Sequence, residues 1–372
     1  MNPENEGTVA ILNLARTTQG MRFKVLLTYM IVLFTIVSIT QAYQLNATNV
    51  SKDNYAPVSI INVVVNSSLG TNTTSENLTV YTNESGGIGT VRNITDWELN
   101  GTSIAILNMP FIFGSNSTFT KDYSKNSNNG TVINAIWNPT GGPLGEGSYS
   151  FDGATSYIEI SHLNVSNSIT VTAWVNYTDP NQNGFIIGKN PVNTEWELFF
   201  ETGVLKWRSS LGDDIDCASP SPNAWHYIVA EQSGSRANIY VDGVLCSTGT
   251  ISTIGNDDNS VDIGRFDSGY YFSGEIAGIQ VYDRSLSPAQ IANIYNNQTD
   301  IIANQELLAG DMWSACITSN DGVTESSTVC SNNVTILAPL VPEYNETISN
   351  CTQLQNMQYN LSGKYSLSNN ID

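Results

Sequence analysis

The chain has 372 residues, enough for two or three domains, and its 13% of charged residues and 29 glycines are typical of a globular protein and not of a disordered one. Its 14 Lys and Arg residues stand against 34 Asp and Glu residues, a net charge of −20, so we expect cations as ionic partners and no nucleic acid, because the phosphate backbone would be repelled. Seventeen Asn-x-Ser/Thr sequons between Asn46 and Asn360 are typical of an exported chain that can be N-glycosylated.

The N-terminal segment has the order of a secretion signal. Arg22 and Lys24 precede an uncharged run of fifteen residues, 25–39, and Ala42 supplies a small residue for cleavage. The run is shorter than the roughly 20 residues that span a bilayer, so we expect secretion, with an uncleaved hydrophobic helix that anchors the chain in a membrane as the alternative. Residues 1–42 are predicted to be this leader and signal or anchor, and the protein is predicted to be extracellular or at a cell surface.

Short strands are predicted on both sides of a long central stretch. Residues 58–65, 76–82 and 93–107 alternate in polarity between Gly, Ser, Asn and Thr turns. These strands form only part of a β-sandwich, and the missing part follows far along the chain at residues 306–337, which predict two further strands and a turn.

The central stretch contains a clear hairpin signal, WHYIVAEQSGSRANIYVDGVLC, over residues 225–246. Tyr227 and Val229 share one strand face, and Ile239 and Val241 share another. Asp242-Gly243 is a type I′ turn signal that leads into the next strand.

Three blocks of this stretch together resemble a known family. They are SYSFDGATSYIEI (residues 148–160), the hairpin above, and GEIAGIQVYDRSLSPAQIANIY (residues 274–295). The blocks resemble a laminin-G-like jelly roll of the concanavalin A type, in the expected order and spacing. The resemblance implies an all-β jelly-roll sandwich over residues 109–299.

The segments around the jelly roll resemble one immunoglobulin-like module. Residues 43–108 would be its first part and residues 300–338 its second, with Trp313 at the corner before its penultimate strand. We therefore expect the jelly roll to be inserted into an immunoglobulin-like β-sandwich, so that both ends of the insert lie close together.

The five cysteines fit an oxidising compartment. We predict a bridge between Cys217 and Cys246, which would join adjacent strands, and a second between Cys316 and Cys330 across a hairpin turn. Cys351 is the fifth. Residues 339–372 begin with a Pro-containing linker, and residues 361–372 resemble the first rung of an adhesin-type β-solenoid, as in a fragment of a longer surface protein.

A calcium site is predicted in the loop TKDYSKNSNNGT, residues 120–131, which is rich in oxygen ligands. The family resemblance places Asp122, Asn126 and Asn128 in ligand positions, although Ala277 stands where the family often has an acidic residue. The alternative is a turn capped by its own side chains.

Catalysis is not expected. Glu195 and Glu197 would share a strand face, but Glu201 lies at the wrong offset for the acidic strand of the glucanase relatives, so we expect solvated carboxylates on an edge strand. His162 and His226 lack a nucleophile in a recognisable motif, and His226 is expected to be a strand residue near the surface.

Glycan binding requires exposed aromatic side chains. Trp174, Trp196 and Trp207 are expected to lie mostly in the core, whereas Tyr270 and Tyr271 lie in a predicted loop and are the candidate glycan-binding residues. The sequence thus predicts a non-catalytic protein that binds extracellular glycans or surface proteins. The alternatives are an accessory part of a carbohydrate-active enzyme and a structural spacer in a surface layer.

Overall fold

The computed structural model describes residues 56–189, 196–209, 213–255, 258–266, 269–339, 346–357 and 365–367. The predicted leader and signal or anchor segment lies outside these ranges. Among the residues that are described, no helix is both long enough and apolar enough to cross a membrane.

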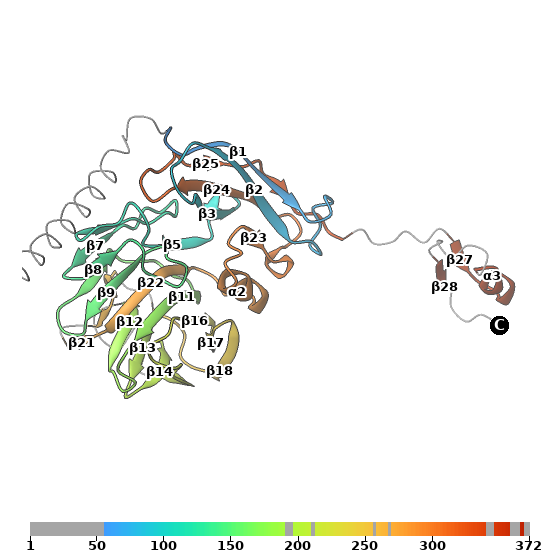
Figure 1. The fold of residues 1–372 in the computed structure, drawn as a ribbon. Helices are drawn as coiled ribbons and strands as arrows, with labels where there is room; N and C mark the ends of the chain where they lie inside the picture. Colours follow the sequence, from blue (N-terminus) through green and yellow to red (C-terminus); the bar gives the residue numbers. More distant parts are fainter. Residues whose placement is uncertain are drawn as a thin grey trace, which may run out of the picture. The chain divides into compact units, whose positions relative to one another are not determined.

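The centre of the chain is a sandwich of two large antiparallel sheets (Figure 1). The front sheet has the order β15 (Asp214–Ala218), β14 (Val204–Arg208), β13 (Glu197–Glu201), β12 (Gly184–Lys189), β19 (Val261–Ile263), β10 (Tyr157–Ile160), β7 (Gly130–Ile133) and β6 (Phe119–Thr120). The back sheet has the order β18 (Val244–Thr250), β17 (Arg236–Val241), β16 (His226–Ser233), β11 (Ser168–Tyr177), β22 (Ser273–Tyr282), β9 (Ser148–Asp152) and β8 (Ile136–Asn138), and β5 (Ala105–Met109) also pairs with β22.

Alternation along the strands builds the core between these sheets. In β11, Val171, Ala173 and Val175 point inward, and in β13 Leu198 and Phe200 do so from the opposite sheet. Trp196 and Trp207 are fully buried there, as predicted.

The predicted hairpin is confirmed. Strand β16 pairs with β17 and β17 pairs with β18, both antiparallel. Asp242 and Gly243 have φ angles of 52° and 76°, the positive values that a type I′ turn requires at both central positions.

Two smaller sheets, here called the flanking sheets, are built from both sides of the jelly roll. One has the order β1 (Ser59–Ser67), β2 (Leu78–Ser85) and β23 (Ile301–Ile302). The other has the order β25 (Val329–Cys330), β24 (Met312–Asn320), β3 (Arg92–Leu99) and β4 (Thr102–Ser103), with β26 (Val334–Thr335) also on β24. Strands from before and after the jelly roll therefore lie side by side (Figure 1), and that they form an immunoglobulin-like module stays a prediction.

One expectation about the boundary is corrected. The strand predicted over residues 93–107 is three strands, β3, β4 and β5. Asn100 and Gly101, with φ angles of 53° and 84°, turn the chain between β3 and β4. Strand β5 does not stay with the flanking sheets but pairs with β22 of the jelly roll.

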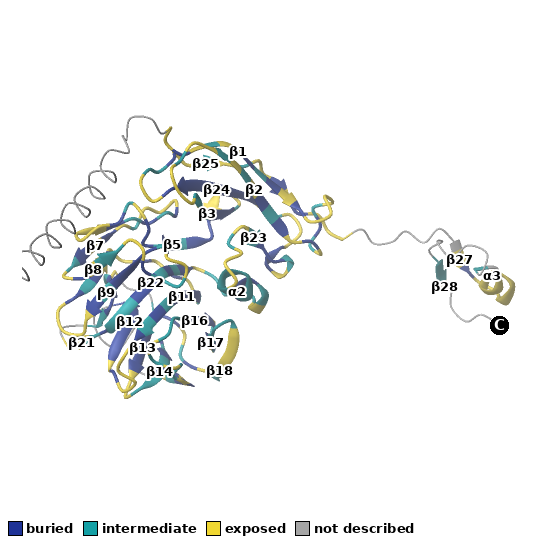
Figure 2. Cartoon of the chain, in the orientation of Figure 1, coloured by how far each residue is buried: buried dark blue, intermediate teal, exposed yellow. Residues whose placement is uncertain are grey.

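A second core joins the flanking sheets to the outer face of the back sheet. Tyr227 and Tyr282 of the back sheet pack in one cluster with Trp97 of β3 and Trp313 of β24. The two indole rings meet edge to face with centroids 6.4 Å apart. Ile291 of helix α2 (Pro288–Tyr295) closes the same cluster, and Figure 2 shows β24 buried along almost its whole length.

Both predicted disulfides are present. The Cys316–Cys330 bridge joins β24 to β25, which are neighbours in one sheet. The Cys217–Cys246 bridge differs from the expectation, because it does not join adjacent strands of one sheet. It ties β15, at the edge of the front sheet, to β18, at the edge of the back sheet.

The C-terminal part contains a short parallel pair, β27 (Glu346–Ile348) with β28 (Tyr365–Leu367), and helix α3 (Cys351–Asn356) between them. Cys351 lies exposed on α3. Most of the predicted solenoid rung, residues 361–364 and 368–372, falls outside the described ranges, and a solenoid stays a prediction.

Candidate functional site

The outer face of the front sheet carries a group of stacked rings. Phe185 of β12 stacks on Phe199 of β13 with centroids 4.6 Å apart and planes at 5°, as expected for cross-strand partners. Phe266, in β20 (Arg265–Phe266), stacks on Phe185 at 4.5 Å. Tyr270, in β21 (Tyr270–Tyr271), lies 6.1 Å from Phe185. These four residues are named the aromatic cluster.

The aromatic cluster lines a pocket of about 430 Å³, a volume within the usual range for small-molecule sites. Tyr270 is 53% exposed, whereas Phe185 and Phe199 are buried beneath it. The polar lining comes from the carboxylate, amide and hydroxyl groups of Glu201, Asn183 and Thr202, and from Arg208. The full lining is Asn183, Phe185, Phe199, Phe200, Glu201, Thr202, Arg208, Phe266 and Tyr270.

Arg208 connects the pocket to a charged network on the same face. Its Nε lies 2.6 Å from Asp214 Oδ1, and its Nη1 lies 3.4 Å from Glu197 Oε2. The guanidinium also lies 4.6 Å from the centre of the Phe199 ring, a cation–π distance. Hydrogen bonding to Asp214 raises the pKa of Arg208 against the effect of burial, so the group stays charged.

Lys206 is a second cation beside the pocket. Its Nζ lies 3.2 Å from Glu201, 3.3 Å from Asp214 and 3.2 Å from Asp216. These two cations share four carboxylates, counting Glu197, so neither is left over for an anionic ligand.

Glu197 corrects an expectation. We predicted solvated carboxylates on an edge strand, but β13 lies between β12 and β14, and Glu197 is 2% exposed. Burial raises its pKa to about 7, against the lowering effect of Arg208. Glu201 on the same strand is exposed, and Glu195 lies outside the described ranges.

The two predicted glycan-binding residues are separated by the structure. Residues 270–271 form a short strand and not a loop, since β21 pairs with β20. Successive side chains of a strand point to opposite sides, and only Tyr270 lines the pocket. That these residues bind a ligand stays a prediction.

The Asp122 loop is held by its own hydrogen bonds. Asp122 is 3% exposed, and its Oδ1 accepts from the backbone N–H groups of Asn108 and Ser124, at 2.8 and 2.9 Å. Its Oδ2 accepts from the Ser124 hydroxyl and the Asn128 N–H, both at 2.7 Å. Burial raises the pKa of this carboxyl against these four hydrogen bonds.

The two predicted amide ligands serve the same purpose. The Nδ2 groups of Asn126 and Asn128 donate to the carbonyl oxygens of Ala105 and Ile106, at 3.3 and 2.8 Å, and so fasten the loop to β5. This geometry favours the turn capped by its own side chains, and a calcium site stays a prediction.

His226 lies in a network that the sequence did not reveal. Its Nδ1 is 2.8 Å from Asp242 Oδ2, and its Nε2 is 3.1 Å from the hydroxyl and 3.0 Å from the carbonyl oxygen of Ser221. The spacing resembles a Ser-His-Asp triad. Nε2, however, lies as close to the backbone carbonyl oxygen of Ser221 as to its hydroxyl, so the contacts differ from those of a catalytic triad. The network locks the start of β16 to the turn after β17.

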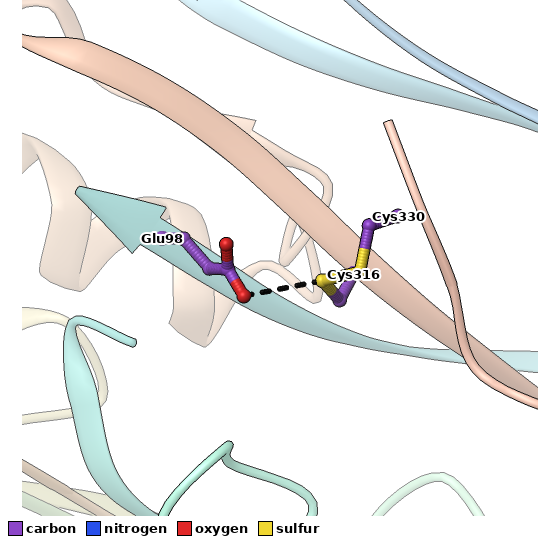
Figure 3. A group of neighbouring side chains, drawn as sticks. All are labelled: Glu98, Cys316 and Cys330. Atoms are coloured by element: carbon purple, nitrogen blue, oxygen red, sulfur yellow. Dashed lines mark hydrogen bonds between the residues drawn. A yellow bond between two sulfur atoms is a disulfide. The ribbon is translucent and has the colours of Figure 1, made fainter. Parts of the chain in front are cut away.

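One further group of close polar atoms lies in the flanking sheets (Figure 3), where Glu98 Oε1 is 3.2 Å from the Cys316 sulfur. The Glu98 carboxylate also meets Lys125 Nζ at 2.7 Å and the Ser314 hydroxyl at 3.2 Å. Because Cys316 is bridged to Cys330, neither sulfur is a thiolate, the form that binds metals.

The alternation of inward and outward residues along the strands could have identified part of the pocket from the sequence. Phe185, Phe199 and Arg208 occupy the strand positions that point away from the core, and such outward phenylalanines in central strands signal either a covered face or a site. Phe266 gives no such signal, because the fold brings it to the pocket from a segment that is more than 60 residues further along the chain than Phe199.

Comparison with solved structures finds binding domains of botulinum neurotoxins. The receptor binding domain of the C/D mosaic serotype is 13% identical, with 52% of this chain and 51% of that chain covered and a TM-score of 0.43. The serotype G binding domain is 17% identical, with 52% and 51% covered and a TM-score of 0.42. The serotype D ligand binding domain in complex with N-acetylneuraminic acid is 14% identical, with 52% and 51% covered and a TM-score of 0.44.

The chain spans about half the length of these solved domains. No curated protein matches the chain. Residues 152–292, from the end of β9 into α2, match the family described as the concanavalin A-like lectin/glucanases superfamily, which confirms the jelly-roll family that the three sequence blocks resemble.

Proposed function

We propose that the protein is an extracellular, non-catalytic carbohydrate-binding protein and that its glycan site is the pocket beside Tyr270. The observation that supports this most is the combination of an exposed ring above stacked phenylalanines with amide, hydroxyl and carboxylate groups at one rim. Rings of this kind bind the apolar face of a sugar, and the polar groups fix its hydroxyls.

The charges of the site favour neutral sugars. Arg208 and Lys206 are both held by carboxylates, so a sugar carboxylate would have to displace Asp214 or Glu201 to meet a cation. A neutral sugar can instead donate its hydroxyls to the free sides of these carboxylates. The proposed ligand class is therefore a neutral glycan on another cell or in the surrounding matrix, in a role such as adhesion.

A glycan array with matched neutral and sialylated glycans tests the proposal on the full chain. We expect wild type to bind neutral members, and Tyr270→Ala to lower the affinity about tenfold or more, which corresponds to at least about 1.4 kcal/mol. Tyr271→Ala is the matched control, because Tyr271 is the next residue of the same strand and its ring does not line the pocket. This variant should bind like wild type.

The glycan array separates the proposal from the structural-spacer alternative. A structural spacer binds no member of the array. An accessory part of an enzyme binds polysaccharide in the same way, and a catalytic domain releases shortened products that chromatography detects. Binding that survives Tyr270→Ala would place the site elsewhere.

A further inference from the structure

The N-glycosylation sequons are unevenly distributed along the chain. Of 44 asparagines, ten lie between residues 177 and 296, and none of them begins a sequon, whereas 17 of the other 34 do. The same stretch contains 19 Ser and Thr residues, so a shortage of hydroxyl residues does not explain the gap.

The sequon asparagines that the structure describes lie at the surface. Asn72 and Asn176 are half-buried and all the rest are exposed, as attachment of a bulky, hydrated glycan requires. The described set is Asn66, Asn72, Asn77, Asn83, Asn93, Asn100, Asn116, Asn129, Asn164, Asn176, Asn297, Asn333 and Asn350.

The fold gathers many of these sites on the flanking sheets. Asn66 lies on β1, Asn83 on β2 and Asn93 on β3, while Asn77 precedes β2 and Asn100 follows β3. On β1 and β2, Asn66 is paired with Thr79, so Asn66, Asn83 and the exposed ring of Tyr81 share one face of that sheet.

The pocket face is free of sequons for a structural reason. Its strands β12, β13 and β14, and the β20–β21 pair, all come from the sequon-free stretch. Asn116 and Asn129 precede β6 and β7, which are separated from β12 by β19 and β10. At the usual strand spacing this places them roughly 15 Å or more from the pocket. Asn164 follows β10, whose last residue is level with the end of β12 that is far from Phe185. Asn176 projects from the outer face of the back sheet, because Val175 beside it points into the core.

We propose that the mature protein carries N-linked glycans on the flanking sheets and on the β6–β7 edge, and that the pocket face is kept free of them. The sequons supply the modification sites, and the fold supplies the separation. The glycans would cover the part of the surface where no ligand is expected and leave open the face with the pocket. The inference concerns modification of the chain and does not depend on which ligand the pocket binds.

Two tyrosines with similar exposure provide an internal comparison. Tyr81 is 58% exposed and lies among Asn66, Asn77 and Asn83, whereas Tyr270 is 53% exposed on the face without sequons. Without glycans, a small reagent such as tetranitromethane should therefore nitrate the two rings to a similar extent.

The experiment compares the secreted full chain before and after enzymatic removal of N-glycans, with glycopeptide mapping of the untreated protein. We expect glycans at Asn66, Asn77 or Asn83, a several-fold increase in Tyr81 nitration after their removal, and unchanged nitration of Tyr270. Absence of glycan from all mapped flanking-sheet sequons would overturn the proposal, and so would equal protection of both tyrosines. The measurement uses no glycan ligand, so its failure is distinct from failure of the proposed function.

Discussion

The two outer faces of the jelly roll carry similar aromatic side chains but have different surroundings. On the front face, the aromatic cluster is left open and Tyr270 is exposed. On the back face, Tyr227 and Tyr282 are buried under the flanking sheets and α2. In both sheets these aromatic side chains point outward because successive side chains of a strand alternate between its two faces. Whether they form a pocket or a core therefore depends on whether another segment covers that face.

The largest expected effect comes from weakening the packing of the flanking sheets against the back sheet. Trp313→Ala removes a fully buried indole from the cluster that joins the flanking sheets to the back sheet. We expect the free energy of unfolding to fall by about 3–5 kcal/mol. Urea titration measures it, with Tyr81→Ala as the control for an exposed ring, which should change stability by less than about 1 kcal/mol.

The disulfide between the sheet edges comes next. The double variant Cys217→Ser with Cys246→Ser opens a loop with a sequence separation of 29, and chain entropy alone predicts a loss of about 3.6 kcal/mol. The same change at Cys316 and Cys330, with a separation of 14, predicts a loss of about 3 kcal/mol. The first variant should speed hydrogen exchange at the edges of both jelly-roll sheets. The second should speed it only in the flanking sheet that contains β24 and β25. Hydrogen exchange that shows the same pattern in both variants would contradict this assignment.

The buried carboxylate of the front face predicts a pH dependence. The folded pKa of Glu197 is about 7 and its ordinary value is 4.5, so the folded state binds the proton more tightly and stability falls as pH rises from about 4.5 to 7. The shift corresponds to about 3 kcal/mol. Glu197→Gln should remove this loss, whereas Glu201→Gln, an exposed carboxylate on the same strand, should not.

A second group titrates in the same window. Burial raises the pKa of Asp96 to about 7, and Asp96 lies in β3 of the flanking sheets. Glu197→Gln should therefore reduce the pH slope without abolishing it, and the double variant with Asp96→Asn should reduce it further, with the raised pKa of Asp122 still contributing. A wild-type protein with equal stability at pH 5 and pH 7 would contradict both assignments.

The smallest expected effect concerns calcium. If the Asp122 loop binds calcium with roughly 0.1 mM affinity, 1 mM calcium adds about 1.4 kcal/mol of stability. Asp122→Asn would abolish that gain, but four donors meet this carboxylate, so the variant should also lose about 1–3 kcal/mol without calcium. Thermal melts with calcium and with chelator separate the two effects. Equal melting temperatures of the wild type in both conditions would mean that the loop is a turn that binds no calcium.

The sequence predicted local features better than it predicted which faces of the sheets are buried. The hairpin after Trp225 and the Cys316–Cys330 pair depend on neighbouring residues and turn chemistry, and these predictions hold. The Cys217–Cys246 pair was also predicted, but the strands that it joins were not, because they belong to two different sheets. The position of Glu197 was predicted wrongly, because burial of a strand face depends on strand order, which a local pattern does not contain. Phe266 reaches the pocket for the same reason: a segment distant in sequence brings it there.

The β3–β24 ladder has a mechanical consequence. Eight residue pairs, from Leu99 with Trp313 to Arg92 with Asn320, join the strand before the jelly roll to the strand after it. Tension applied at residues 56 and 339 would act first on the flanking sheets, and the ladder would have to open from its Arg92 end before any force entered the jelly roll. The geometry of the pocket would therefore be insulated from pulling on the chain, so a bound partner would be released by its own dissociation and not by deformation of the site.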